Sequence, residues 1–399
     1  MAFPDVRLDD PVRMTQELIR LKNPLDCLDF VRYCLESIGF EYEVLTFNGV
    51  SNLFAHKSAA HPGAQAHLLF LGHVDVVPPG DLALWVIPPF SGEIVDDRVY
   101  GRGSADMKGG IASFLAALWM LQGVSPSVLP RMLQLQGPEV SLLITCDEEG
   151  IAEYGAKAAL QHLLAKGRLN AVEFAIIGEP TAKQSIGDHI KIGGRGSLNV
   201  KVTVTGRAGH VAYPATAINP IPPAVSFLYD LCNTRFDDVD NRPNIFEHTN
   251  IEITSINVDN TATNIIPERI QAQFNIRFNR QQTRDSLTAF IENLAARYNG
   301  AQWRFDYDFA SDPFLSKGGP ALDTLVKICE ETTGDAPLVS AQGASSDARF
   351  LQDICPFAEI GLLAEQAHKI NEHTAATHLL SLRDIFYRFL LAFTAANPR

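Results

Sequence analysis

The stretch AHLLFLGHVDVV, residues 66–77, decides the fold class of this chain. Apart from His67 it begins as an apolar run, which is typical of a strand buried on both faces of a mostly parallel sheet. It ends with His73 and Asp75, whose side chains point to the same side of an extended backbone. The stretch therefore predicts a central strand that delivers an imidazole and a carboxylate together at its end.

The remainder of the first half repeats this pattern. Two more apolar runs, VSLLITC (140–146) and VEFAIIGE (172–179), also predict buried strands that lead into acidic residues. Segments with a helical pattern predict helices at 10–21, 25–38, 108–121 and 153–166. Strands that alternate with helices in this way predict an α/β layered domain.

A different pattern begins after about residue 195 and indicates a second, smaller domain. LNVKVTVTG (198–206) alternates strictly between apolar and polar residues, which is typical of an antiparallel strand with one exposed face. Further elements follow in the order α-β-β-α-β, near residues 220–235, 249–256, 268–278, 282–298 and 301–309. The complete order β-α-β-β-α-β is that of a ferredoxin-like α+β domain.

The chain then returns to the α/β pattern, with helices predicted near 320–333 and 380–395. Its 399 residues also exceed the size at which one hydrophobic core usually keeps growing. We therefore predict a catalytic metal-binding domain made of residues 1–194 and 311–399, with a mixed sheet and flanking helices. Residues 195–310 would form an inserted lid or dimerisation domain.

The composition is that of an ordinary globular enzyme, with 46% hydrophobic and 20% charged residues. No apolar run approaches the roughly 20 residues that span a bilayer, and the charged N-terminus lacks the apolar stretch of a secretory signal. Six scattered cysteines without a C-x-x-C pair favour reduced thiols, so we predict a cytoplasmic protein. The net charge of −13 opposes binding to nucleic acid, and an anionic substrate would need local arginines.

Several polar residues follow the apolar strands or lie in Gly-rich loops, where open α/β sheets bind their ligands. They are His73, Asp75, Asp106, Glu148, Glu149, Glu179 and, far downstream, His368. Taken singly, each has an ordinary structural interpretation: Asp106 could cap a helix, and His373 or His378 could take the place of His368. Side chains of the types that bind metals occur at several separate strand ends, and this favours a metal centre over a set of unrelated surface residues.

The chemical types of these side chains suggest the metal. Imidazole and carboxylate ligands without thiolate suit zinc, with cobalt or manganese as substitutes. One catalytic zinc usually takes three protein ligands, so five of these side chains, with one carboxylate bridging, fit two zinc ions. Other chemistry has weaker support: G-x-G-x-x-D at 101–106 departs from the dinucleotide fingerprint, and nothing fixes a serine triad built on Ser104, Ser345 or Ser346.

Four motifs carry a resemblance to a known family: GHVDVVPPGD (72–81), YGRGSADMKGG (100–110), TCDEEG (145–150) and GEPTA (178–182). With them, the sequence resembles the co-catalytic two-zinc amidohydrolases, a family that includes desuccinylases, deacetylases and carboxypeptidase-like aminoacylases. The resemblance runs over nearly the whole chain. It implies hydrolysis of an N-acyl amide, first of all N-succinyl-LL-2,6-diaminopimelate to succinate and LL-2,6-diaminopimelate in lysine biosynthesis. The alternatives are an acetylornithine or acyl-amino-acid deacylase, and a non-catalytic member that binds metal or peptide.

Carried over residue by residue, the resemblance implies a role for each metal ligand. Asp106 would bridge the two zinc ions. His73 and Glu179 would complete the ligands of one ion, and Glu149 and His368 those of the other.

The resemblance also implies which groups act beside the metals. Asp75 would accept a hydrogen bond that fixes His73, and Glu148 would be the general base. His210 would stabilise the oxyanion, and it would reach the site together with Asn264 from the partner subunit of a homodimer. The positions that match the substrate cleft are Arg195, Ser197, Tyr213, Arg277 and Ser345.

Two departures bear on the substrate. Where the desuccinylase pattern has an arginine this chain has Gly194, so one carboxylate-binding group is absent, and Ala344 replaces a glycine of the same pattern. These changes touch substrate recognition and leave the metal ligands intact.

Overall fold

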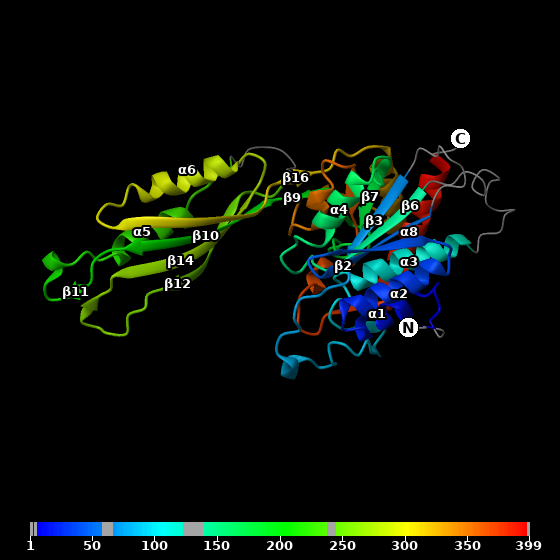
Figure 1. Ribbon diagram of the computed structural model, residues 1–399, viewed down its shortest axis with the longest axis horizontal. Helices are drawn as coiled ribbons and strands as arrows, with labels where there is room; N and C mark the ends of the chain where they lie inside the picture. The colour runs from blue at the N-terminus through cyan, green and yellow to red at the C-terminus, as the bar shows by residue number, and fades with distance from the viewer. Residues whose placement is uncertain (1–2, 4–5, 58–66, 123–138, 238–244, 397–399) are drawn as a thin grey trace. The chain divides into compact units, whose positions relative to one another are not determined.

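The computed structural model describes residues 3, 6–57, 67–122, 139–237 and 245–396. The chain divides into two compact units (Figure 1). Unit 1 comprises Met1–Ile192, Ser316–Ser340 and Ser346–Arg399, and unit 2 comprises Gly193–Leu315 and Ala341–Ser345. Unit 2 thus interrupts unit 1 in the sequence, and each is described by itself.

Within the described residues, unit 1 is built on an eight-stranded mixed sheet in the order β1-β2-β6-β3-β7-β18-β8-β17. Its strands are β1 (Glu41–Phe47), β2 (Val50–Lys57), β3 (His67–His73), β6 (Glu139–Thr145), β7 (Val172–Ile177), β8 (His189–Lys191), β17 (Leu338–Ser340) and β18 (Phe357–Glu359). The three apolar runs of the sequence form β3, β6 and β7, and β3 pairs in parallel with both of the others. The hairpin of β1 and β2 is antiparallel at one edge, and β8 also pairs antiparallel with β18, so the sheet is mixed.

The helices of unit 1 are α1 (Pro11–Arg20), α2 (Pro24–Glu36), α3 (Lys108–Gln122), α4 (Ala156–Ala165), α7 (Pro320–Thr333) and α8 (Ala376–Ala396). Helix α3 is buried on all sides over most of its length and packs against α1 and α8 (Figure 1). Phe70 of β3 stacks on Phe114 of α3 with ring centroids 4.0 Å apart, and Phe386 of α8 meets both rings edge-on. This aromatic cluster joins the helices to the central strand, so the mixed α/β layering predicted from the sequence is confirmed.

A small three-stranded sheet is formed by segments that neighbour Asp106 and His368 in the sequence. It consists of β4 (Ile94–Val95), β5 (Arg98–Tyr100) and β19 (His373–Ala375), in the order β19-β5-β4. The pairing of β19 with β5 places a segment near the end of the chain beside one from the first third. The described part of the unit also contains three short 3-10 helices: η1 (Leu82–Leu84), η3 (Asp347–Phe350) and η4 (Ala364–Gln366).

Unit 2 has the element order β-α-β-β-α-β. The elements are β10 (Gly196–Thr205), α5 (Ile221–Cys232), β12 (Asn250–Asn257), β14 (Arg269–Phe278), α6 (Arg284–Ala295) and β15 (Gln302–Ser311). The strands form an antiparallel sheet in the order β12-β14-β10-β15. The shorter elements are β9 (Gly193–Gly194), β11 (Gly209–His210), η2 (Pro214–Thr216), β13 (Ile265–Ile266) and β16 (Phe314–Leu315).

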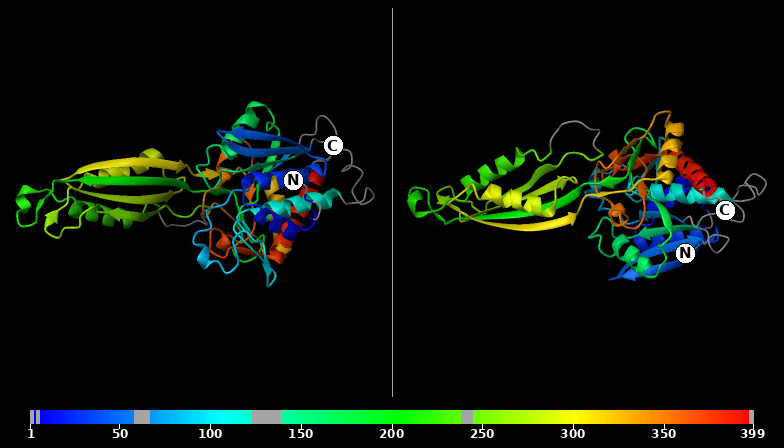
Figure 2. Two further views of the ribbon diagram at one scale, coloured as in Figure 1. Left: turned by 60° about the horizontal axis from the view of Figure 1, so that its bottom comes forward. Right: turned by 90° about the horizontal axis from the view of Figure 1, so that it is seen from above.

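The alternation of side chains separates the two faces of this sheet. The inward residues of β14 are all buried: Ile270, Ala272, Phe274, Ile276 and Phe278. They pack with Val200, Val202 and Val204 of β10 against α5 and α6, which lie on the same face (Figure 2). The opposite face carries polar side chains, which is the pattern of an antiparallel sheet that is half exposed. Within the described residues, no helix is long and apolar enough to cross a bilayer.

Phe274→Ala should lower the free energy of unfolding of unit 2 by about 3–5 kcal/mol, because Phe274 is fully buried in its core. The control is Gln273→Ala, one residue earlier on the exposed face, which should change it by less than about 0.5 kcal/mol. Urea denaturation followed by the fluorescence of Trp303, which packs on Phe227 in the same unit, makes the measurement. Equal effects of the two substitutions would contradict the assigned faces.

Candidate metal centre

Five polar side chains predicted from the sequence as metal ligands meet in unit 1. His73 ends β3, Glu149 follows β6, and Glu179 follows β7, while Asp106 lies just before α3 and His368 follows η4. Because β3, β6 and β7 are parallel neighbours, their carboxyl ends lie at one edge of the sheet, where α/β proteins place their ligands.

Asp106 lies at the centre of the cluster, and its two carboxylate oxygens face different partners. Oδ1 lies 3.3 Å from Nε2 of His73, which is itself 3.7 Å from Oε1 of Glu179. Oδ2 lies 3.2 Å from Nε2 of His368, which is 2.8 Å from Oε1 of Glu149. The structure thus divides the five side chains into two groups that share one carboxylate.

These distances fit a pair of divalent cations. Ligand atoms about 2.0–2.1 Å from a tetrahedral metal ion lie about 3.3 Å from one another, which matches the spacing of both histidines from Asp106. Ligand atoms of His73, Asp106 and Glu149 lie within 4.8 Å of one another. Oδ1 of Asp106 is buried and has no hydrogen-bond partner among the described residues, as a metal-ligating oxygen would be without its ion.

The electrostatics of the cluster also favour cations. Among the described residues, no lysine or arginine forms an ion pair with Asp106, Glu148, Glu149 or Glu179. Burial and the nearby charge of Asp106 raise the pKa of Glu179 well above its usual range. Hydrogen bonding to Asp106 and the charge of Glu149 raise the pKa of His368 to about 9, although burial opposes this rise. The bare cluster can therefore hold its carboxylates together only with bound protons, and divalent cations would take their place.

Two glycines explain how the strands and the loop approach so closely. Gly72 precedes His73, and Gly178 precedes Glu179. A Cβ atom at either glycine would lie 2.9 Å from Cε of Met107, the buried residue that follows Asp106. Because glycine has no side chain at these two positions, Met107 can pack between the ends of β3 and β7. Asp106, the residue before Met107, is thereby brought close to His73 and Glu179.

The partner of His73 differs from the one expected. Its Nδ1 lies 2.9 Å from the backbone oxygen of Asp75 and 3.7 Å from the carboxylate Oδ1 of the same residue. The carbonyl therefore accepts the hydrogen bond that orients the ring. The Asp75 carboxylate instead accepts a hydrogen bond of 3.0 Å from the backbone N–H of Glu149, so it links two of the ligand loops.

Glu148 is the half-buried neighbour of the ligand Glu149. Burial and the charges of Asp347, Glu149 and Asp106 raise its pKa from 4.5 to about 8, against the opposing charge of His73. A carboxyl group with a pKa near the working pH can both accept and donate a proton, as a general base and acid must. The burial and electrostatic environment of Glu148 are compatible with the role expected of it.

Two buried residues near the centre, Arg102 and Glu372, were not predicted from the sequence. They form an ion pair with 2.7 Å between Nη1 and Oε2. Glu372 accepts hydrogen bonds from the backbone N–H groups that precede and include Asp106. The available signal was an acidic residue in the same short motif as His368, HKINEH, but its local spacing gave no reason to connect it with the loop at 101–106. The alternatives to His368 lie elsewhere: His373 is in β19 and His378 is in α8.

The remaining predicted residues lie in unit 2, where three of them share one turn region. His210 in β11 pairs with Ile265 of β13, and the backbone oxygen of Asn264 accepts from Val211 N at 3.1 Å. The rings of His210 and Tyr213 lie 5.7 Å apart, and Tyr213 is 66% exposed. The structure therefore brings His210, Tyr213 and Asn264 together on the surface of this unit.

A second group in unit 2 surrounds Arg195. Its Nη1 donates to Oδ1 of Asn250 at 2.7 Å, and its Nη2 lies 2.8 Å from Oε2 of Glu247. Nε of Arg195 and Oγ of Ser345 are buried without a hydrogen-bond partner among the described residues. Ser197 and Arg277 are paired neighbours on β10 and β14, and burial together with the charge of Arg195 lowers the pKa of Arg277. Much of the Arg195 fork is thus already engaged within the unit.

Position 194 has no room for the arginine that the resemblance leads one to expect. A Cβ atom at Gly194 would lie 2.7 Å from the ring of Phe314, its neighbour across the β9–β16 pair.

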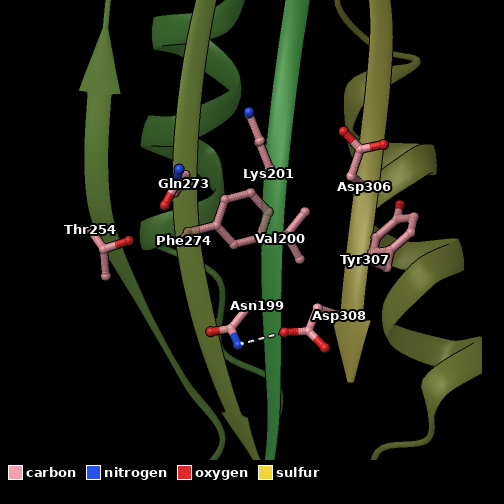
Figure 3. A pocket seen from close by; sticks show the side chains of 9 residues that line it. All are labelled: Asn199, Val200, Lys201, Thr254, Gln273, Phe274, Asp306, Tyr307 and Asp308. Atoms are coloured by element: carbon pink, nitrogen blue, oxygen red, sulfur yellow. Dashed lines mark hydrogen bonds between the residues drawn. The ribbon is translucent and has the colours of Figure 1, made fainter. Parts of the chain in front are cut away.

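The polar face of the unit 2 sheet carries a hollow of about 300 Å³ (Figure 3). It is lined by Asn199, Val200, Lys201, Thr254, Gln273, Phe274, Asp306, Tyr307 and Asp308. Asn199 donates to Asp308 at 3.2 Å across the strands. None of the predicted site residues lines this hollow, and we interpret it as part of the solvated sheet face.

Comparison with known proteins identifies the family. Residues 69–392 match the model of peptidase family M20/M25/M40, and the chain belongs to this family of hydrolases. A succinyl-diaminopimelate desuccinylase of Ehrlichia canis (strain Jake) is 40% identical over 96% of this chain and 98% of its own length. One of Rhodospirillum centenum is also 40% identical, over 98% of this chain and 99% of its own length.

Solved structures agree on the fold. An M20 family metallo-carboxypeptidase from Sulfolobus solfataricus superimposes with a TM-score of 0.74 at 16% identity, over 96% of this chain and 99% of its own. A dinuclear metal binding peptidase of the M20 family from Bacillus subtilis has a TM-score of 0.67 at 17% identity, over 96% of this chain and 97% of its own.

Glu148→Gln should stabilise the metal-free protein more at high pH than at low pH. The folded state keeps the proton of Glu148 up to about pH 8, whereas the unfolded state loses it near pH 4.5. Stability is therefore lost as pH rises between these values, and a glutamine escapes the loss. We expect the variant to gain on the order of 2 kcal/mol relative to wild type between pH 5 and pH 8.5.

Urea denaturation of the chelator-treated proteins at both pH values makes this measurement. The control is Glu153→Gln, at an exposed carboxylate that pairs with Lys157. A stability difference between Glu148→Gln and wild type that does not change with pH would contradict the environment assigned to Glu148.

Proposed function

We propose that this chain is a two-zinc hydrolase of N-acyl amides whose first substrate is N-succinyl-LL-2,6-diaminopimelate, cleaved to succinate and LL-2,6-diaminopimelate. It would act in lysine biosynthesis in the cytoplasm, and cobalt or manganese could replace zinc. The observation that carries the proposal is Asp106, with one oxygen 3.3 Å from His73 and the other 3.2 Å from His368. The choice of substrate is supported by the two succinyl-diaminopimelate desuccinylases that are 40% identical to this chain over nearly their full lengths.

The protein side chains divide the work around the cations. His73 and Glu179 would hold one ion, Glu149 and His368 the other, and Asp106 both. When bound, the two ions polarise the amide carbonyl, lower the pKa of water and neutralise developing charge.

Glu148 is the group that moves protons. It would accept a proton from the attacking water and donate it to the nitrogen of the leaving amine. Its raised pKa, about 8 before cations bind, supports this double role. Cations nearby favour the ionised carboxylate and move that pKa downward. An intact base next to a metal ligand also speaks against a member that only binds metal or peptide.

An anionic acyl group needs cationic partners, because the chain as a whole carries a net charge of −13. Arg277 is the better candidate of the two arginines, since no ion pair engages it among the described residues, whereas Arg195 is held by Glu247 and Asn250. Ser197, Tyr213 and Ser345 would supply hydroxyl groups to the substrate. The guanidinium plane suits a carboxylate, which it binds through two parallel hydrogen bonds.

One observation favours a related deacylase as the second candidate. Gly194 and the ring of Phe314 stand where the desuccinylase pattern has an arginine, so the acyl pocket has one charge fewer. An acetylated substrate such as acetylornithine, or another acyl amino acid, would need fewer cationic contacts.

A substrate panel separates these candidates. Zinc-loaded protein is assayed with the succinylated and acetylated forms of diaminopimelate and ornithine, and the values of kcat/KM are compared. The proposal predicts the highest value for N-succinyl-LL-2,6-diaminopimelate. Preference for an acetylated amine would reassign the substrate, and undiminished hydrolysis after removal of all metal would refute the mechanism.

Glu148→Gln should lower kcat by about 10²–10⁴-fold while close to two metal ions per chain remain bound, because the base is lost and the ligands are intact. Glu149→Gln is the matched comparison at the adjacent ligand and should lose metal. Metal content by elemental analysis and turnover on the same samples make the measurement. Loss of both metals from Glu148→Gln would reassign that residue as a ligand.

A homodimer in which His210 acts on the partner's site is a further part of the proposal. In unit 2, β12 is an edge strand that α5 contacts, and α5 carries the exposed apolar side chains Val225 and Tyr229. Unpaired strand edges and exposed apolar residues favour self-association.

Mixing two inactive variants tests action across the subunits. A His210→Ala chain keeps its own Glu148, and in a mixed dimer it would receive His210 from a Glu148→Gln partner. Random exchange of subunits should then restore about one quarter of the wild-type activity, since half of the dimers are mixed and each has one intact site. No recovery, in dimers that are shown to have exchanged, would mean that His210 acts within its own chain or not at all.

A further inference from the structure

A buried ion pair joins the two loops that carry Asp106 and His368. Arg102 and Glu372 are 3% and 0% exposed, and Nη1 of Arg102 donates to Oε2 of Glu372 at 2.7 Å. Charged groups are buried this deeply only when they are paired and hydrogen-bonded.

Glu372 holds the loop of Asp106 through its backbone. Oε2 accepts from Gly103 N at 3.0 Å, and Oε1 accepts from Ala105 N at 3.0 Å and from Asp106 N at 3.2 Å. The backbone oxygen of Glu372 also accepts from Gly101 N at 2.9 Å. With Arg102 included, four donors converge on this one carboxylate, and they fix the path of the loop up to the bridging residue.

Arg102 holds the segment of His368 in the same way. Nη1 donates to the carbonyl oxygen of Lys369 at 3.1 Å, and Nη2 lies 3.4 Å from that of His368. Nη2 also reaches the carbonyl oxygen of Pro78 at 3.5 Å. The guanidinium lies over the ring of Trp85, 5.4 Å from its centroid. The planar fork thus connects three segments that are far apart in the sequence.

The backbone of His368 has an unfavourable conformation that the Arg102–Glu372 pair can stabilise. Its φ is +63°, in the left-handed region that residues with a side chain seldom adopt. Such a conformation costs on the order of 1–3 kcal/mol and persists only where the surrounding contacts enforce it, often at functional sites. Arg102 makes those contacts at the carbonyl groups of His368 and of the residue that follows.

We propose that Arg102 and Glu372 are a positioning pair that sets the spacing between Asp106 and His368, and thereby controls the affinity for the cation that these two ligands share with Glu149. The inference rests on the two-metal function proposed above. Neither residue is a metal ligand, and both act through the backbone of the loops.

The effect should differ between the two cations. His73 and Glu179 follow strands β3 and β7, whose positions the sheet fixes independently of the pair. Asp106 and His368 lie on loops instead, and the Arg102–Glu372 pair connects them. Loosening the pair should therefore weaken the cation on the Glu149–His368 side more than the one on the His73–Glu179 side.

Metal affinities of single and paired variants test the proposal. Arg102→Lys keeps the positive charge but loses the planar guanidinium. Glu372→Gln keeps the shape of the side chain but replaces one hydrogen-bond-accepting carboxylate oxygen with an amide NH₂ group. Because a lone buried charge can prevent folding, the uncharged double variant Arg102→Met with Glu372→Gln is included. Phe389→Leu is the control: it weakens the ring contacts of Phe389 with Phe174 of β7 and with Phe393 of the same helix, α8, and neither contact involves the two loops.

Zinc binding by each full-length protein is titrated against a competing chelator, and thermal unfolding is recorded on the same samples. In the variants of the pair, we expect the zinc on the Glu149–His368 side to bind about 10–100-fold more weakly than in wild type. The affinity for the zinc on the His73–Glu179 side should stay within about threefold of wild type. Phe389→Leu should lower stability and leave the ratio of the two affinities unchanged. The absorption spectrum of the cobalt-loaded protein gives a second readout, because it reports the geometry of each ion.

The outcomes are distinct. Folded variants of the pair that bind two zinc ions with wild-type affinities would overturn the proposal, and so would a loss shared equally by both ions and matched by the control. A wild-type protein that binds fewer than two zinc ions would refute the proposed function itself, before any variant is considered.

Discussion

The site depends on the concentration of negative charge around Asp106. Four carboxylates and two imidazoles share a small, largely buried volume, and no lysine or arginine pairs with those carboxylates among the described residues. Ionised carboxylates cannot remain so close in a medium of low dielectric constant without compensation. Protons can compensate them, as the raised pKa of Glu148 and Glu179 indicates, but two divalent cations do so while leaving Glu148 free to move protons.

The fold brings the candidate ligands together from several separate strands and loops. Parallel central strands bring His73, Glu149 and Glu179 to one edge of the sheet, and glycines next to two of them let Met107 fit between the strands. The two ligands from loops need another support, and the buried pair of Arg102 and Glu372 supplies it by binding the backbone of both loops. In the proposed two-metal site, the sheet would position one cation, and the ion pair would adjust the position of the other.

The sequence predicted the parts of the fold that local patterns encode. Buried runs predicted β3, β6 and β7, and strict alternation predicted the faces of β10. The β1–β2 hairpin was missed although Asn48-Gly49, both with positive φ, is a typical hairpin turn, because β1 is mostly exposed and shows little apolar pattern. The five candidate ligands could be selected because several strand ends carried them, and the structure brings their side chains together; their role as ligands stays a prediction. The Arg102–Glu372 pair could not, because 270 residues separate its members and only the folded chain brings them together.

Zinc-edge anomalous diffraction from crystals grown with zinc can show whether these five side chains hold two cations. We expect two anomalous peaks about 3.5–4 Å apart, one on each side of the Asp106 carboxylate. One peak should contact His73 and Glu179, and the other Glu149 and His368. A single peak, or zinc bound elsewhere while these five side chains remain without metal, would contradict the account.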